Sequence, residues 1–128
     1  MLMTVRDETA AGRAVGSIVL DVPGTVTLRE LIRLRVREEV ARHNAAPTER
    51  FQGLVRPTEA EEDLNGYRMR TPMRIDWERQ ADAAVTAFER NGFFVLVADQ
   101  QVEELDEELT LNEAADVAFV RLMPLVGG

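Results

Sequence analysis

The sequence lacks cysteine and lysine altogether, and it has a single histidine. Without cysteine there is no disulfide framework, no thiolate metal site and no cysteine nucleophile, so any thiol chemistry must come from a partner. All 15 basic residues are arginine, a bias typical of a GC-rich genome. No paired acid and base, metal cluster or phosphate loop is recognisable, and we therefore predict a protein that is not an enzyme and holds no metal.

Excess positive charge and long apolar runs are missing as well. The net charge of −8 works against binding a polyanion, which needs Lys and Arg to neutralise phosphates. The longest strongly apolar run, 93–98, is far below the roughly 20 residues that span a bilayer, and the start "MLMTVRDE" does not resemble a secretory signal. We expect a cytoplasmic protein without nucleic-acid or membrane partners, folded as one domain over residues 1–128.

The first residues alternate as the two strands of a β-hairpin do. One strand is predicted over residues 2–8, and the second in "VGSIVLDVPG", where Pro23 and Gly24 end the run. The apolar side chains expected on the buried face are Met3, Val5, Ile18, Leu20 and Val22.

A capping box predicts a helix that begins after Thr27, whose hydroxyl can accept from the Glu30 N–H while the Glu30 side chain reaches back. Pro47 should stop this helix, and His43 near its end suits the negative end of the helix dipole, a structural role. The predicted apolar stripe is Leu28, Leu31, Ile32, Val36 and Val40. A second stripe of Arg29, Arg33 and Arg37 is interpreted as a solvated face.

Residues 46–91 are interpreted as an insertion. A capping box of Thr58 and Glu61 suggests one short helix within an extended loop. Helical periodicity returns over 75–91, and Asn91-Gly92 tolerates the left-handed end of a helix. The side chains on its expected core face are Trp77, Ala81, Ala84, Val85 and Phe88.

Three strands are expected after this helix. The apolar run 93–98 is typical of a strand with both faces covered, or with one face serving a partner. A short strand or loop follows around Val102, and the last strand lies in "DVAFVRLM". Past Pro124, residues 124–128 should form a flexible tail. Acidic residues between these strands, interpreted as solvated surface with docking of a basic partner as the alternative, are Glu103, Glu104, Asp106, Glu107 and Glu108.

This order resembles the ubiquitin-like β-grasp superfamily, which also holds the sulfur carriers of thiamine and molybdopterin synthesis. The similarity is best over 92–128, "FFVLVADQQVEELDEELTLNEAADVAFVRLMPLVGG" after Gly92, where an apolar strand, a short strand ending "LTL" and a last strand lead to Gly-Gly. The resemblance implies an α+β fold in which a helix covers a mixed sheet. An inserted loop and a second helix would lie between the first helix and the third strand.

The resemblance also implies a function for the tail. An adenylating activating enzyme would use ATP to form an acyl-adenylate at Gly128, because a free carboxylate is a poor electrophile; the chain itself would hold no permanent cofactor. The enzyme would recognise the tail residues Arg121, Met123, Pro124, Leu125, Val126 and Gly127. Glycine has no Cβ and fits a narrow channel.

Three functions stay open at this point. The first is a protein modifier transferred through Gly128 to an acceptor protein, for which a lysine-free surface would suppress chains of the modifier on itself. The second is a sulfur carrier that forms a thiocarboxylate and works with a sulfurtransferase, as the ending "PLVGG" suggests. The third is a non-covalent interaction module that uses its sheet to bind a partner.

Overall fold

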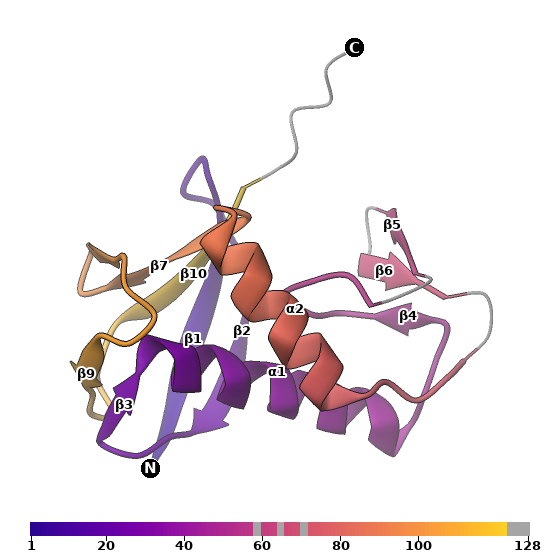
Figure 1. Ribbon diagram of the computed structural model, residues 1–128, viewed down its shortest axis with the longest axis horizontal. Helices are drawn as coiled ribbons and strands as arrows, with labels where there is room; N and C mark the ends of the chain where they lie inside the picture. The colour runs from indigo at the N-terminus through magenta and orange to yellow at the C-terminus, as the bar shows by residue number, and fades with distance from the viewer. Residues whose placement is uncertain (58–59, 64–65, 70–71, 123–128) are drawn as a thin grey trace.

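The centre of the fold is a five-stranded mixed sheet (Figure 1). The computed structural model describes residues 1–57, 60–63, 66–69 and 72–122. The sheet order is β2-β1-β10-β7-β8, in which β1 and β10 are parallel and the other neighbours are antiparallel. The strands are β1 (Leu2–Thr9), β2 (Ala14–Asp21), β7 (Phe93–Val97), β8 (Gln100–Val102) and β10 (Val117–Arg121). The last described strand is therefore central and lies beside the first.

The predicted N-terminal hairpin is confirmed. Strands β1 and β2 pair antiparallel, with Met3 opposite Leu20 and Val5 opposite Ile18. These four side chains and Val22 are buried, because alternate residues of a strand point to one face and this face meets the helices. The turn between the strands holds Gly12 at φ 84°, a left-handed conformation that glycine adopts readily.

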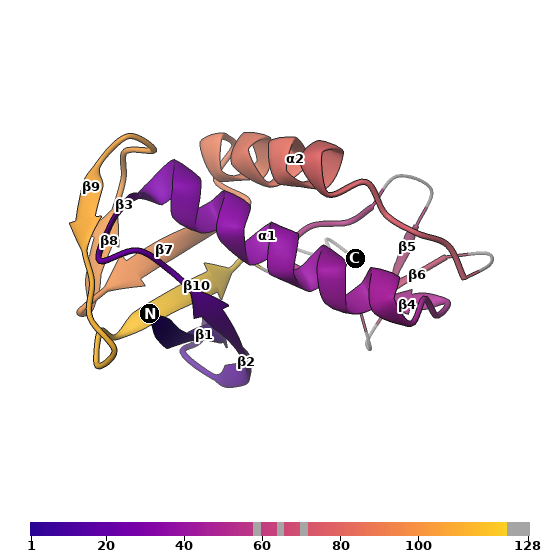
Figure 2. The same ribbon diagram turned by 90° about the horizontal axis from the view of Figure 1, so that it is seen from below.

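Helix α1 (Leu28–Ala45) lies across one face of the sheet (Figure 2). Thr27 caps it as predicted and accepts from the Glu30 N–H at 3.1 Å. The Glu30 side chain reaches back, as predicted, and its carboxylate accepts from the Thr27 hydroxyl at 3.0 Å. All five residues of the predicted apolar stripe are buried, and the helix ends before Pro47 as expected.

Helix α2 (Trp77–Glu89) runs alongside α1 (Figure 2), and this pairing corrects one prediction. The guanidinium carbons of Arg33 and Arg37 each lie 5.4 Å from the centre of the Trp77 ring, and Arg33 pairs with Asp82 at 3.2 Å. The arginine stripe is thus partly a contact between helices through cation–π attraction, and its interpretation as a purely solvated face was wrong. Asn91, at φ 60°, follows α2 in the predicted left-handed conformation.

The predicted core face of α2 is confirmed in its small residues. Ala81 and Ala84 are buried completely, whereas Trp77, Val85 and Phe88 are partly buried and pack against the core. Small side chains at the centre of the contact let the two helices approach closely.

The insertion contains a small antiparallel sheet that the sequence did not predict. Its order is β4-β6-β5, formed by β4 (Arg50–Phe51), β5 (Glu61–Asp63) and β6 (Gly66–Arg68). Glu61 begins a strand, so the short helix proposed for this stretch is wrong, while Thr58 lies outside the described residues. Phe51, at 1% exposure, anchors the small sheet to the core.

The run 93–98 forms β7, and its side chains alternate. Phe93 and Val95 are buried beneath the helices, whereas Phe94 and Leu96 are half-buried on the opposite face. Residues Ala98 and Asp99 both have positive φ and turn the chain into β8, as in a two-residue hairpin.

Two further strands form a separate two-stranded sheet near the start of α1. β9 (Glu108–Thr110) pairs with β3 (Thr25–Thr27). The acidic residues that precede β9 are exposed as predicted, and Asp106 pairs with Arg29 of α1 at 3.1 Å.

The α+β class, with two helices in the described part of the chain, is therefore confirmed. Neither helix is long and apolar enough to cross a membrane.

Candidate functional site

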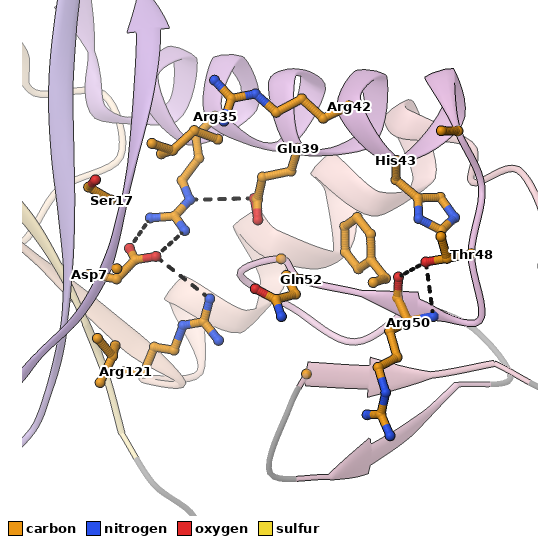
Figure 3. A pocket seen from close by; sticks show the side chains of 17 residues that line it. Asp7, Ser17, Arg35, Glu39, Arg42, His43, Thr48, Arg50, Gln52 and Arg121 are labelled. Carbon is orange, nitrogen blue, oxygen red and sulfur yellow. Dashed lines mark hydrogen bonds and ion pairs between the residues drawn. The ribbon is translucent and has the colours of Figure 1, made fainter.

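A cleft of about 640 Å³ lies where the central sheet, the second half of α1 and the insertion meet (Figure 3). We call it the arginine cleft, because Arg35, Arg42, Arg50 and Arg121 line it. The sheet also contributes Asp7 and Ser17, α1 contributes Glu39 and His43, and the insertion contributes Thr48 and Gln52. Four arginines and two carboxyl groups line this cleft in a protein whose net charge is −8.

Helix α1 brings three polar residues to this cleft at a helical spacing. Arg35, Glu39 and His43 follow one another at intervals of four and are all buried. They belong to the buried face of the helix, where Arg35 and Glu39 alternate with Val36 and Val40 of its apolar stripe. Sequence analysis missed Arg35 and Glu39 as site residues, although their position in line with Leu28, Leu31 and Ile32 was a signal that could have found them.

Arg35 is the centre of the cluster and is 2% exposed. Its Nη2 donates to Asp7 Oδ2 at 2.7 Å and its Nη1 donates to Asp7 Oδ1, a bidentate pair. Its Nε donates to Glu39 Oε1 at 3.4 Å, and its guanidinium carbon lies 4.7 Å from the centre of the Phe119 ring. Burial opposes the charge of Arg35, but the two carboxylates outweigh it, so the pKa of Arg35 lies above its usual value.

Glu39 is the second buried charge-bearing group of the cleft. Burial raises the pKa of Glu39, with a smaller contribution from Asp7, and the charges of Arg35 and Arg121 and the Leu54 amide oppose the rise without cancelling it. Oε2 of Glu39 has no hydrogen-bond partner among the described residues. A Cβ on Gly53 would lie 2.9 Å from this oxygen and would collide with the Phe51 ring, so the covering loop needs glycine here.

Replacing Glu39 by glutamine should reduce the loss of folding stability as the pH rises from 4 to 8. Because the folded pKa of Glu39 is raised, the folded state holds a proton that the unfolded state releases near its ordinary pKa of about 4.3. Stability from this group is therefore present below that pH and is lost as the pH rises through the folded pKa. Urea unfolding from pH 4 to 8 should show Glu39→Gln gaining stability over the unmodified protein as the pH rises.

All other titrating groups are the same in Glu39→Gln and in the unmodified protein. Their contributions therefore cancel when the two free energies of unfolding are subtracted. Glu38→Gln, a change at the neighbouring half-exposed position of α1, is the matched control for a glutamate-to-glutamine change on the same helix. A constant difference between Glu39→Gln and the unmodified protein at every pH would contradict the assignment.

Arg121 is the only predicted tail-recognition residue that the structure describes. It is the final residue of β10 and lines the cleft, and its Nη2 lies 3.8 Å from Asp7 Oδ2. Its side chain is 36% exposed, yet its Nε is buried and has no hydrogen-bond partner among the described residues. The other predicted residues, Met123, Pro124, Leu125, Val126, Gly127 and Gly128, lie outside the described part of the chain.

His43 has the structural role that its position suggested. Its Nε2 lies 2.7 Å from the Met73 carbonyl oxygen, and its ring meets Phe51 edge-on with centroids 5.5 Å apart. Asn44 donates to the Ile75 carbonyl at 2.9 Å and accepts from the Ile75 N–H at 2.8 Å. Both residues fasten the insertion to α1 and so hold the far wall of the cleft in place.

The described residues contain no group of three or more His, Cys, Asp or Glu side chains that could hold a metal ion. The cleft offers guanidinium donors together with two carboxyl groups, which suits recognition of a polar group.

Fold and site together describe an α+β domain with a mixed sheet and an arginine-lined cleft. The chain matches no family model, no curated protein and no solved structure in comparisons with known proteins.

Proposed function

We propose that this chain is a ubiquitin-like protein modifier with a β-grasp fold, activated through its C-terminal glycine. The observation that carries the proposal is the strand order β2-β1-β10-β7-β8, with the last described strand central and parallel to the first. A hairpin, a helix across the sheet, and returning strands around a parallel central pair are the β-grasp arrangement. The insertion with α2 enters between α1 and β7 without interrupting this order.

The residues just before the proposed tail are hydrogen-bonded into the sheet. This supports recognition of the tail by an activating enzyme. Strand β10 hydrogen-bonds β1 on one side and β7 on the other, up to Arg121. The N–H of Leu122 donates to the Gly92 carbonyl at 3.4 Å, and its side chain is 40% exposed. A segment that starts from such an anchored point would be offered to an activating enzyme from a fixed place on the domain.

The chemistry assigned to the tail is acyl transfer. An activating enzyme with bound ATP would join the Gly128 carboxylate to the α-phosphate and release pyrophosphate. A thiolate of that enzyme would displace AMP and form a thioester with Gly128, and an amine of an acceptor protein would then displace the thiolate to form an amide. The lack of cysteine and lysine fits a donor that supplies neither the thiolate nor a competing side-chain amine.

Deletion of Gly127 and Gly128 is the decisive experiment. The chain would be produced with an N-terminal affinity tag in the cells that naturally make it, and conjugates would be resolved on reducing, denaturing gels. We expect tagged bands of higher mass from the unmodified chain and none from the deletion. The matched control, Gly24→Ala, alters an exposed glycine and should keep the bands; bands that persist in the deletion would rule out the proposal.

Two alternatives have an observation in their favour. The sequence "PLVGG" resembles the ends of sulfur carriers, and for that function intact mass should reveal conversion of the Gly128 carboxylate to a thiocarboxylate. The half-buried Phe94 and Leu96 on the open face of the sheet favour a non-covalent interaction module. For such a module, a C-terminal extension that blocks Gly128 would leave function intact, whereas it would abolish both tail-dependent functions.

A further inference from the structure

The polar network of the arginine cleft is incomplete in the protein alone. Buried polar groups in folded proteins are nearly always hydrogen-bonded, and a buried group without a partner calls for a physical explanation such as a bound ion or water. Two such atoms, Glu39 Oε2 and Arg121 Nε, occur among the described residues, and both belong to residues that line this one cleft. Glu39 Oε2 accepts and Arg121 Nε donates, so an anion can complete only the network around Arg121, whose side chain is 36% exposed although its Nε is buried.

The charges of the cleft define the sign of that group. Asp7 is already occupied, because both of its oxygens accept from Arg35. Arg35 also holds Glu39 through Nε, so the two carboxyl groups share the innermost arginine. The Nη2 atom of Arg121 lies no closer than 3.8 Å to Asp7 Oδ2. Its guanidinium is therefore the least satisfied cation of the cluster. Arg42 adds a positive field from the rim, where it is half-exposed and pairs with Glu38.

The volume of the cleft indicates a small ligand rather than a macromolecular partner. Its volume of about 640 Å³ falls within the range of roughly 300–1,000 Å³ that is typical of small-molecule sites. Figure 3 shows Arg121 rising from the sheet toward Asp7, opposite the insertion loop that carries Gln52. A concave space of this size, with a guanidinium reaching into it, suits one polar molecule.

We propose that the arginine cleft binds a metabolite-sized ligand through an oxyanion group, a phosphate or a carboxylate, held by Arg121. A guanidinium presents two parallel N–H donors, which match both groups bidentately. The oxyanion gives Arg121 a closer anionic partner than Asp7, which is 3.8 Å away, and Arg42 strengthens the attraction of the anion into the cleft. The residues that carry this proposal do not include Gly127 or Gly128, so the site can be tested separately from activation at Gly128.

Titration of the ¹⁵N-labelled chain with simple oxyanions tests the proposal. Inorganic phosphate and malonate are added in separate arms, with sodium chloride at matched ionic strength, and the Nε–H resonance of Arg121 is followed by NMR. We expect a saturable shift in at least one oxyanion arm, with a dissociation constant on the order of millimolar for such small probes. Saturation by phosphate alone assigns a phosphate-bearing ligand, and saturation by malonate alone assigns a carboxylic acid.

Matched variants locate the binding, followed through backbone amide shifts. Arg121→Gln should weaken it about tenfold, as expected for loss of one charge-assisted contact, and Arg42→Gln by about two- to threefold through loss of field. Arg90→Gln, an exposed arginine outside the cleft, should bind normally. The deletion of Gly127 and Gly128 should also bind normally, so failure of tail activation and failure of this site are distinguishable. Absence of a saturable shift in both oxyanion arms, or equal binding by Arg121→Gln and Arg90→Gln, would overturn the proposal.

Discussion

Replacing Arg35 by methionine is expected to destabilise the protein by about 3–5 kcal/mol, the usual cost of removing one partner from a buried ion pair. The loss is large because Arg35 is 2% exposed and is the shared partner of Asp7 and Glu39. Methionine fills a comparable volume, so the effect reports on charge and hydrogen bonding rather than on a cavity. Equilibrium unfolding in urea at pH 7 measures it.

The control for this prediction is Arg42→Met, a change on the same helix. Arg42 is half-exposed and pairs with Glu38 at 2.9 Å, and exposed pairs contribute only about 0–1 kcal/mol. The double variant Asp7→Leu with Arg35→Met should recover part of the lost stability, because it removes the Asp7 carboxylate that Arg35→Met leaves buried without its partner, while Glu39 remains. If Arg35→Met costs no more than Arg42→Met, Arg35 is not the centre of a buried cluster.

Replacing Phe119 by alanine is expected to cost about 3–5 kcal/mol as well. Phe119 is completely buried in the central strand β10 and stacks on Phe93 with centroids 5.9 Å apart. Its ring also faces the guanidinium of Arg35, so the change removes an aromatic surface from both the core and the buried cluster. Thermal and urea unfolding give the loss.

Phe94→Ala is the matched control, one phenylalanine on the other face of the same sheet. Phe94 is half-buried, and its truncation should cost only about 1–2 kcal/mol. Because Phe119 and Arg35 are in contact, the losses of Phe119→Ala and Arg35→Met should not be additive in the double variant. Equal losses of unfolding free energy in Phe119→Ala and Phe94→Ala would show that the face of the sheet on which Phe119 lies is not the core.

Local patterns predicted the elements that have one clear apolar face. Met3 and Val5 alternate as strand residues do, and the stripe from Leu28 to Val40 repeats at a helical period. In both cases burial follows directly from the period of the backbone. Asn91 before Gly92 likewise has a local reason to end α2, since both residues tolerate positive φ.

The residues that were missed depend on contacts distant in sequence. Arg35 is buried because Asp7, on another element, accepts from its guanidinium, and nothing within α1 shows that partner. The stripe of Arg29, Arg33 and Arg37 has the composition of a solvated face, and only the position of Trp77 turns part of it into a helix contact. The strands of the insertion have two or three residues each, too short for any period to be recognised.

The parallel pairing of β1 with β10 determines when this protein can fold during its synthesis. Strand β10 lies between the N-terminal hairpin and the β7–β8 hairpin, so the two halves of the sheet cannot join until Val117–Arg121 has left the ribosome. Until then the side chains of Met3 and Val5 cannot be fully buried, and the edge of β1 that later pairs with β10 is free to pair with other chains. Nascent chains should therefore expose this edge of β1 until residues 117–121 have been made.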